Sequence, residues 1–387
     1  MNYKLALEEL YSMKEWKFKL GLKNMKVLLK KIGNPEKKLK CIHVTGTNGK
    51  GSVCAMINSV LIDAGYKVGM YTSPHLKKFN ERIRINKKFI SNKDVAEYYL
   101  RVKRHVTNQS FFEITTAMMF LYFYERKIDF AVLEVGMGGR LDSTNVIVPL
   151  ISIITNIGYE HTHRLGKTLG KIAYEKSGII KNKVPVVTGA HGIALQTIKK
   201  IANRRNSKLV TARKKNKFKL GLKGNFQQQN AAIALAALEL LNNENKIKIN
   251  KANIKNGLKK ARWPARFQFI SKNTIIDSAH NPDGFKVLFN ELKNLKYNRL
   301  ILVAGFSKDK DIKKISEIIK SNKKIREIIV TQADNERAMA AEEAKQYFKN
   351  PIIIKNSKKA FDYAKKIAGK NDLVLVCGSI YMVGEIV

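Results

Sequence analysis

The chain has 387 residues, of which 44% are hydrophobic, so it is long enough to bury two ordinary cores. Its net charge of +42 comes from 73 Lys and Arg against 31 Asp and Glu, but the lysines are spread over the whole length. Because they form no basic arm with interleaved aromatic residues, the composition argues against nucleic-acid binding as the main function. The low glycine and proline content excludes a fibrous or low-complexity protein.

The cysteines and the N-terminal residues predict a cytoplasmic protein. Cys41, Cys54 and Cys377 form no CxxC pair and no even-numbered disulfide framework, so we expect three buried thiols in a reducing compartment. The first ten residues contain Glu8 and Glu9 and lack the apolar segment of a signal peptide. No run of about eighteen apolar residues, the length that spans a bilayer, is found.

Short apolar segments alternate with helical segments through the first two thirds of the chain. The predicted strands are Cys41–Thr45, Val68–Tyr71, Phe130–Val135 and Ile151–Asn156. Helices are predicted at Ser52–Ala64, which Gly65 ends, and at Gln228–Leu241. This alternation indicates an α/β fold with a mainly parallel sheet and helices on both faces.

The strand pattern starts again after the segment Arg262-Trp263-Pro264-Ala265-Arg266, where Pro264 breaks the preceding helix. The later predicted strands are Ile275–Asp277, Leu300–Ala304, Glu327–Thr331, Ile352–Ile354 and Leu373–Cys377. We therefore predict an N-terminal P-loop ATPase-like domain over residues 1–264 and a smaller, Rossmann-like α/β domain over residues 265–387.

The most informative local motif runs from Val44 to Ser52 and reads VTGTNGKGS. It follows a predicted strand and opens a predicted helix, so its backbone N–H groups and the helix N-terminus can face phosphate groups, and Lys50 can reach the terminal ones. The spacing departs from GxxxxGK[ST], and a plain glycine-rich turn is the alternative interpretation. The predicted ATP-binding residues of the motif are Thr47, Asn48, Gly49, Lys50, Gly51 and Ser52.

Glu134 ends an apolar predicted strand and lies directly before Val135-Gly136-Met137-Gly138-Gly139. The carboxyl end of a strand is the usual place for an acidic metal ligand in an open α/β sheet. Mg²⁺ prefers oxygen ligands and keeps several waters. We therefore predict that Glu134 is a metal ligand, with a solvated strand-end carboxylate as the alternative.

Further motifs follow the P-loop in a fixed order. They are YTSPHL (71–76), NERI (80–83), FE (112–113), EVGMGGRLDSTN (134–145), HT (161–162), EKSGI (175–179), WPARF (263–267), DSAHNP (277–282), DKD (309–311) and CGSIY (377–381). The P-loop variant resembles that of the Mur ligase superfamily. The whole ordered set resembles the folylpolyglutamate synthase and dihydrofolate synthase family over nearly the full chain.

The resemblance implies roles for four metal-site residues. Ser73 and Glu134 would hold Mg²⁺ bound to ATP, and Glu134 and His161 would serve a second Mg²⁺. Lys176 would be carbamylated, which converts a cation into a carboxylate that ligates this second metal. Taken alone, Lys176 would be an ordinary surface lysine and His161 a polar loop residue. Lys50, His161, Lys176 and His280 are the expected catalytic residues.

The resemblance also assigns residues to ATP. Asn230 would bind adenine, although a polar cluster at a helix N-terminus is the alternative. Arg266 would reach the phosphates, Asp277 the ribose hydroxyls, and His280 the transferred phosphate. Phe226 stands where the family more often has His, so no role is carried over to that position.

For the pterin, the resemblance implies that Asp142 hydrogen-bonds the ring, that Phe112 stacks on it and that Arg82 faces the pocket. The alternative for Phe112 is a core aromatic, which is the more common place for a phenylalanine. The incoming glutamate would meet the C-terminal domain, for which no residue is named. The expected partners are small molecules, namely ATP, L-glutamate and dihydropteroate or a folate. A monomer is expected, and whether K⁺ assists is open.

The predicted function is an ATP-dependent, ADP-forming ligase that adds L-glutamate to dihydropteroate, to folates or to both, through an acyl phosphate. A cell-wall Mur ligase is the first alternative, but only about forty residues precede Cys41, too few for a nucleotide-sugar domain. A basic P-loop ATPase that binds nucleic acid is the second, and an inactive homologue is the third.

Overall fold

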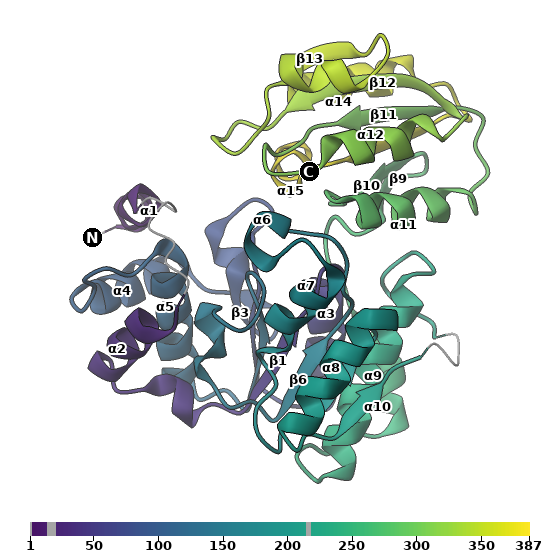
Figure 1. Ribbon diagram of the computed structural model, residues 1–387. Helices are drawn as coiled ribbons and strands as arrows, with labels where there is room; N and C mark the ends of the chain where they lie inside the picture. The colour runs from purple at the N-terminus through teal and green to yellow at the C-terminus, as the bar shows by residue number, and fades with distance from the viewer. Residues whose placement is uncertain (1, 14–20, 214–217) are drawn as a thin grey trace. The chain divides into compact units, whose positions relative to one another are not determined.

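The computed structural model describes residues 2–13, 21–213 and 218–387 (Figure 1). The chain forms two compact units. The first consists of Met1–Gly158, Thr162–Gly221 and Gln228–Ala261, and the second of Tyr159–His161, Leu222–Gln227 and Arg262–Val387. Two short segments from the N-terminal two thirds of the chain therefore belong to the second unit. The boundary between residues 264 and 265 stays a prediction.

An eight-stranded sheet in the order β4-β3-β2-β5-β1-β6-β7-β8 organises the first unit. Its strands are β1 (Cys41–Thr45), β2 (Val68–Tyr71), β3 (Ile83–Ile85), β4 (Lys88–Phe89), β5 (Phe130–Glu134), β6 (Ile151–Ile154), β7 (Val186–Thr188) and β8 (Leu209–Thr211). The sheet is parallel except at β3 and β4. In β1, β2, β5 and β6 every residue is buried, as expected for parallel strands covered on both faces.

Helices pack against this sheet and form hydrophobic cores with its strands. They are α1 (Tyr3–Ser12), α2 (Lys23–Lys31), α3 (Lys50–Asp63), α4 (Asn92–Lys103), α5 (Phe111–Glu125), α6 (Thr162–Leu165), α7 (Leu169–Ser177), α8 (Gly192–Arg204), α9 (Gln227–Asn243) and α10 (Lys251–Lys260). One core joins α1, α2, α4 and α5 to β1, β2 and β5, and another joins α7 and α8 to β6 and β7. Short 3₁₀ helices lie at Pro35–Lys38, Phe79–Arg82 and Ser143–Val146.

The second unit contains a six-stranded sheet in the order β13-β12-β11-β14-β10-β9. Its strands are β9 (Gln268–Ser271), β10 (Thr274–Ile276), β11 (Leu300–Ala304), β12 (Ile325–Gln332), β13 (Ile352–Asn356) and β14 (Leu373–Cys377). Only β9 is antiparallel to its neighbour. The helices are α11 (Pro282–Leu292), α12 (Ile312–Lys320), α13 (Ala341–Ala344), α14 (Ser357–Ile367) and α15 (Ile380–Ile386), with a 3₁₀ turn at Lys345–Tyr347.

The predicted α/β class with two mainly parallel sheets is confirmed. The strands β1, β2, β11 and β14 have the predicted bounds. The predicted helix at Ser52 begins two residues earlier, at Lys50. All three cysteines are free and buried, as predicted. Among the described residues, no helix is long and apolar enough to cross a membrane.

Candidate functional site

The P-loop connects the end of β1 to the start of α3 and is held by hydrogen bonds from the segment after β6. The N–H of Thr47 donates to the main-chain oxygen of Asn156 at 3.0 Å, and the N–H of Asn48 donates to its side-chain Oδ1 at 2.8 Å. Thr155 Oγ1 donates to the carbonyl of Asn48 at 2.6 Å. These contacts hold the loop against the segment that follows β6. The sequence had given Thr155 and Asn156 no role in the site.

Gly49 caps α3 with φ of 85°, a left-handed conformation that L side chains rarely adopt. A Cβ at this position would lie 2.5 Å from Oδ1 of Asn230, a residue in the first turn of α9. The predicted adenine-binding residue therefore lies directly against the P-loop. Both the backbone conformation and the close approach require glycine.

Two lysines converge on one oxygen of the P-loop. Lys50 Nζ donates to the carbonyl oxygens of Gly46 and Thr47, both at 3.0 Å. Lys176 Nζ, at the end of α7, donates to the same carbonyl of Gly46 at 2.8 Å and is only 2% exposed. Two ammonium groups that share an acceptor repel one another, and burial increases the cost of the charge.

Glu134 lies at the carboxyl end of β5 and is 5% exposed. Its Oε2 accepts a hydrogen bond from the N–H of Ser73 at 3.1 Å, so the structure brings these two predicted metal ligands together. Within residues 2–13, 21–213 and 218–387, no group of three or more His, Cys, Asp or Glu could hold a metal. One carboxylate with a neighbouring hydroxyl fits Mg²⁺ that is held mainly by nucleotide phosphates.

Both carboxylate oxygens of Asp142 accept hydrogen bonds from nearby residues of the chain. Its Oδ1 accepts from the N–H of Thr144 at 3.0 Å and from the Thr144 hydroxyl at 2.5 Å, while its Oδ2 accepts from the N–H of Met137 at 3.0 Å. Burial raises the pKa of Asp142, and the hydrogen bond from Thr144 opposes that rise. The carboxylate thus organises the loop between β5 and the 3₁₀ helix at Ser143.

Phe112 contacts the same loop. A Cβ at Gly136 would lie 2.6 Å from Cζ of the Phe112 ring, so only glycine allows this approach. The ring also lies 5.9 Å from that of Tyr71, between centroids. Phe112 and Asp142 are therefore gathered around residues 136–142.

Arg82 is buried and contacts His75 and Phe111. Its Nε donates to Nδ1 of His75 at 2.8 Å, and its guanidinium lies 5.1 Å from the ring centroid of Phe111. Burial, together with the charge of Arg82, lowers the pKa of His75 to about 3. His75 is therefore neutral and accepts this hydrogen bond.

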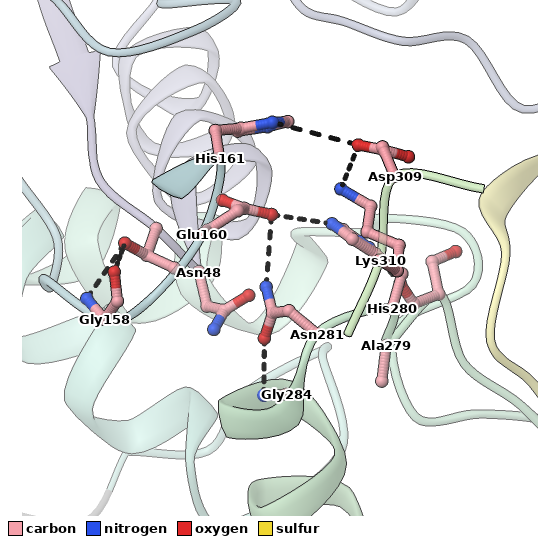
Figure 2. Close-up of polar contacts among 12 residues, drawn as sticks. Asn48, Gly158, Glu160, His161, Ala279, His280, Asn281, Gly284, Asp309 and Lys310 are labelled. Atoms are coloured by element: carbon pink, nitrogen blue, oxygen red, sulfur yellow. Dashed lines mark hydrogen bonds and ion pairs between the residues drawn. The ribbon is translucent and has the colours of Figure 1, made fainter. Parts of the chain in front are cut away.

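In the second unit, a buried carboxylate organises a polar cluster (Figure 2). Glu160 Oε1 lies 2.9 Å from Nε2 of His280 and accepts a hydrogen bond from Nδ2 of Asn281 at 3.2 Å. His280 Nδ1 faces the carbonyl of Ser278 at 2.8 Å. Sequence analysis predicted His280 but missed Glu160, although Glu160 directly precedes His161 in the chain.

His161 also belongs to the second unit and has φ of 50°, which is uncommon for a residue with a side chain. Its Nδ1 lies 3.9 Å from Oδ2 of Asp309, and the same oxygen lies 3.2 Å from Lys310 Nζ (Figure 2). Burial alone would raise the pKa of Asp309, but Lys310, His161 and Arg337 together outweigh burial and lower that pKa. Asp309 lies in the DKD motif, to which the sequence gave no function.

Asp277 and Arg266 lie close together at the start of the second sheet. Asp277 accepts hydrogen bonds from the N–H of Phe267 and of Ala279, each at 2.7 Å. Burial raises the pKa of Asp277, and the charge of Arg266 opposes it. Arg266 Nη1 donates to the carbonyl of Ala265 at 3.1 Å.

Comparison with known proteins gives two family matches: the Mur ligase middle domain over residues 44–218, and the Mur ligase glutamate ligase domain over residues 265–380. A dihydrofolate synthase/folylpolyglutamate synthase from Bacillus subtilis (strain 168) is 38% identical over 409 residues, which cover 95% of this chain and 94% of that protein.

Two solved structures have the same fold. The structure of E. coli FolC in complex with DHPP and ADP has a TM-score of 0.91 and 28% identity, covering 100% of this chain and 97% of that one. A bifunctional folylpolyglutamate synthase/dihydrofolate synthase with Mn, AMPPNP and L-glutamate bound has a TM-score of 0.90 and 27% identity, covering 100% of this chain and 97% of that one.

Proposed function

The chain belongs to the dihydrofolate synthase/folylpolyglutamate synthase family, and from this premise we propose how its residues carry out the reaction. It is an ATP-dependent, ADP-forming ligase that adds L-glutamate to dihydropteroate, to folates or to both. ATP and a divalent metal ion serve the reaction. The observation that carries the residue assignment is that Lys50 and Lys176 both donate to the carbonyl of Gly46. This carbonyl belongs to a P-loop that is hydrogen-bonded to Thr155 and Asn156.

In the first step, the acceptor carboxylate attacks the γ-phosphorus of ATP to form an acyl phosphate and release ADP. The P-loop N–H groups, the N-terminus of α3 and Lys50 bind the phosphates and offset the charge that develops on them. In the second step, the glutamate amine attacks the acyl carbon, and the tetrahedral intermediate expels phosphate. Lys50 can exchange its two main-chain acceptors for phosphate oxygens.

We assign Ser73 and Glu134 to Mg²⁺ bound to ATP, and Glu134, His161 and carbamylated Lys176 to a second Mg²⁺. When bound, these ions would neutralise phosphate charge and orient the reacting oxygens. The hydrogen bond between Ser73 N–H and Glu134 Oε2 supports the first assignment, because it holds the Glu134 carboxylate next to Ser73, the other proposed ligand of this ion.

The position of Lys176 supports its carbamylation. Its amine is buried and donates to the same carbonyl of Gly46 as the Lys50 ammonium, so a carbamate there would place a negative charge beside Lys50. A neutral amine can attack CO₂, losing one proton to solvent and forming an N–C bond. The product is a carbamate anion, which attracts Lys50 and can ligate a metal.

In the second unit, we assign Arg266 to the phosphates, Asp277 to the ribose hydroxyls and His280 to the transferred phosphoryl group. Each oxygen of Asp277 accepts one N–H and keeps a further lone pair for a hydroxyl donor. Asn230 remains our proposed adenine contact, and its position against Gly49 supports that role.

For the acceptor, we propose that Phe112 stacks on the pterin beside the loop 136–142. Asp142 would act partly by shaping that loop, since three of its lone pairs accept internal hydrogen bonds. Arg82, which is hydrogen-bonded to His75, would face the pocket that binds the same substrate. A monomer, a cytoplasmic location and the absence of nucleic-acid binding stay predictions, and whether K⁺ assists stays open.

The acyl phosphate can be tested by trapping. The protein is incubated with Mg·ATP and the acceptor without L-glutamate, in the presence of hydroxylamine. An acyl phosphate gives the hydroxamate of the acceptor and a matching amount of ADP. If the protein turns over with L-glutamate but yields no hydroxamate, the two-step route is wrong.

A further inference from the structure

Glu160 is a buried carboxylate to which neither the sequence motifs nor the reaction scheme gave a role. It is 7% exposed and lies in the three-residue segment Tyr159–His161, which belongs to the second unit although its sequence neighbours belong to the first. Its Oε1 accepts a hydrogen bond from Asn281 at 3.2 Å and lies 2.9 Å from Nε2 of His280 (Figure 2). These partners are 120 and 121 positions away in the sequence.

The two donors are themselves fixed. Asn281 Oδ1 accepts the N–H of Gly284 at 2.8 Å and caps α11, so its amide nitrogen must be the group that faces Glu160. The carbonyl of Ser278 can only accept, so His280 Nδ1 donates to it. With Nε2 directed at Glu160, both ring nitrogens are engaged and the imidazole has one orientation.

We propose that Glu160 is a positioning residue, which holds the His280 ring in the orientation needed for phosphoryl transfer and anchors the segment that carries His161. This rests on the proposed role of His280 in the reaction. In this role Glu160 acts through His280. Misplacement of a catalytic group by about 1 Å can lower a rate by about 100-fold.

The test compares Glu160→Ala, His280→Ala and the double variant of the full chain, because a glutamine at position 160 would keep the oxygen that faces His280 and Asn281. We expect Glu160→Ala to lower kcat by about 10- to 100-fold while the KM for ATP changes little, since binding does not need the ring orientation. When His280 is already replaced, the Glu160→Ala change should cause no further loss of kcat. The matched control is Glu291→Ala, at another buried glutamate of the second unit, which accepts an amide hydrogen bond from Asn225.

Four results would overturn the inference. Full kcat in Glu160→Ala would remove any role, and an equal loss with and without His280 would show that Glu160 acts independently of the ring. If Glu160→Ala and Glu291→Ala lose kcat and thermal stability to the same extent, Glu160 has a structural role only. An unchanged kcat in His280→Ala would refute the role of His280 and this inference, but leave the ligase function standing.

Discussion

Lys50 and Lys176 donate hydrogen bonds to the same acceptor, the main-chain oxygen of Gly46, at 3.0 Å and 2.8 Å. The first lysine begins α3 and the second lies in the last turn of α7, so the shared oxygen joins the phosphate-binding loop to a helix on another part of the sheet. A carbamate on Lys176 would turn repulsion between the two side chains into attraction. The chemical state of Lys176 should therefore affect how Lys50 is held.

Replacing Lys176 by Ala should lower kcat by about 10- to 100-fold, the usual effect of losing a group that orients a metal site. A small carboxylate such as acetate should restore part of the activity, because it can occupy the place of the carbamate. The measurement is ADP release with increasing acetate. Full activity in Lys176→Ala without acetate would refute the carbamate.

Replacing Lys50 by Ala should lower kcat/KM by about 100- to 1,000-fold, as expected when one preorganised charge is removed from the transition state. Steady-state ADP release measures this effect. The matched control is Lys199→Ala on the exposed side of α8, which should leave the rate unchanged. Equal rates for the two variants would contradict the assignment of Lys50 to the phosphates.

Gly49→Ala should weaken the free energy of ATP binding by more than it lowers the free energy of unfolding. The new Cβ would meet Asn230 Oδ1 at 2.5 Å, in addition to the strain of a positive φ. Gly33→Ala is a matched control, because Gly33 has φ of 87° but no neighbouring atom within 4 Å. Both variants should lose about 1–2 kcal/mol of stability from strain. If calorimetry shows unchanged ATP binding in Gly49→Ala, the loop contact is unimportant.

The stability of the protein should fall as the pH drops below 6.5. His43 is fully buried, and burial followed by the charge of Lys181 lowers its pKa from 6.5 to about 3. At pH values between about 3 and 6.5, His43 is protonated in the unfolded chain but neutral in the folded protein. The unfolding free energy should therefore decrease by up to about 1.4 kcal/mol per pH unit for this residue.

Denaturant titrations from pH 7.5 to pH 4 measure this dependence. The slope should be shallower in His43→Gln than in the unaltered protein, while the exposed control His191→Gln should keep it. A His43→Gln slope equal to that of the unaltered protein would show that His43 is not neutral in the folded state.

The fold could be predicted where burial leaves a simple sequence pattern. β1 and β11 are buried at every position and appear as continuous apolar segments with clear ends. β4 has only two residues, both exposed, and β8 is half-buried, so neither produces such a pattern. The helix α5 was missed because it is buried on nearly all sides and has no amphipathic period.

The residues of the candidate site also divide into those that the sequence predicts and those that it does not. The P-loop is local in sequence, and its motif predicts both its position and its ligand. The partners of Asp142 and Arg82 could not be predicted, because a residue type does not tell which hydrogen bonds its side chain makes. Glu160 and His280 are 120 positions apart, so only the folded chain brings them together.

The most direct test of the function is ADP release by the purified protein with Mg·ATP and L-glutamate, with dihydropteroate or tetrahydrofolate added separately. We predict release that requires L-glutamate with at least one of these acceptors. Release with both would show a bifunctional enzyme, and release with one would identify its acceptor. Release with neither, under conditions in which ATP still binds, would contradict the assigned function.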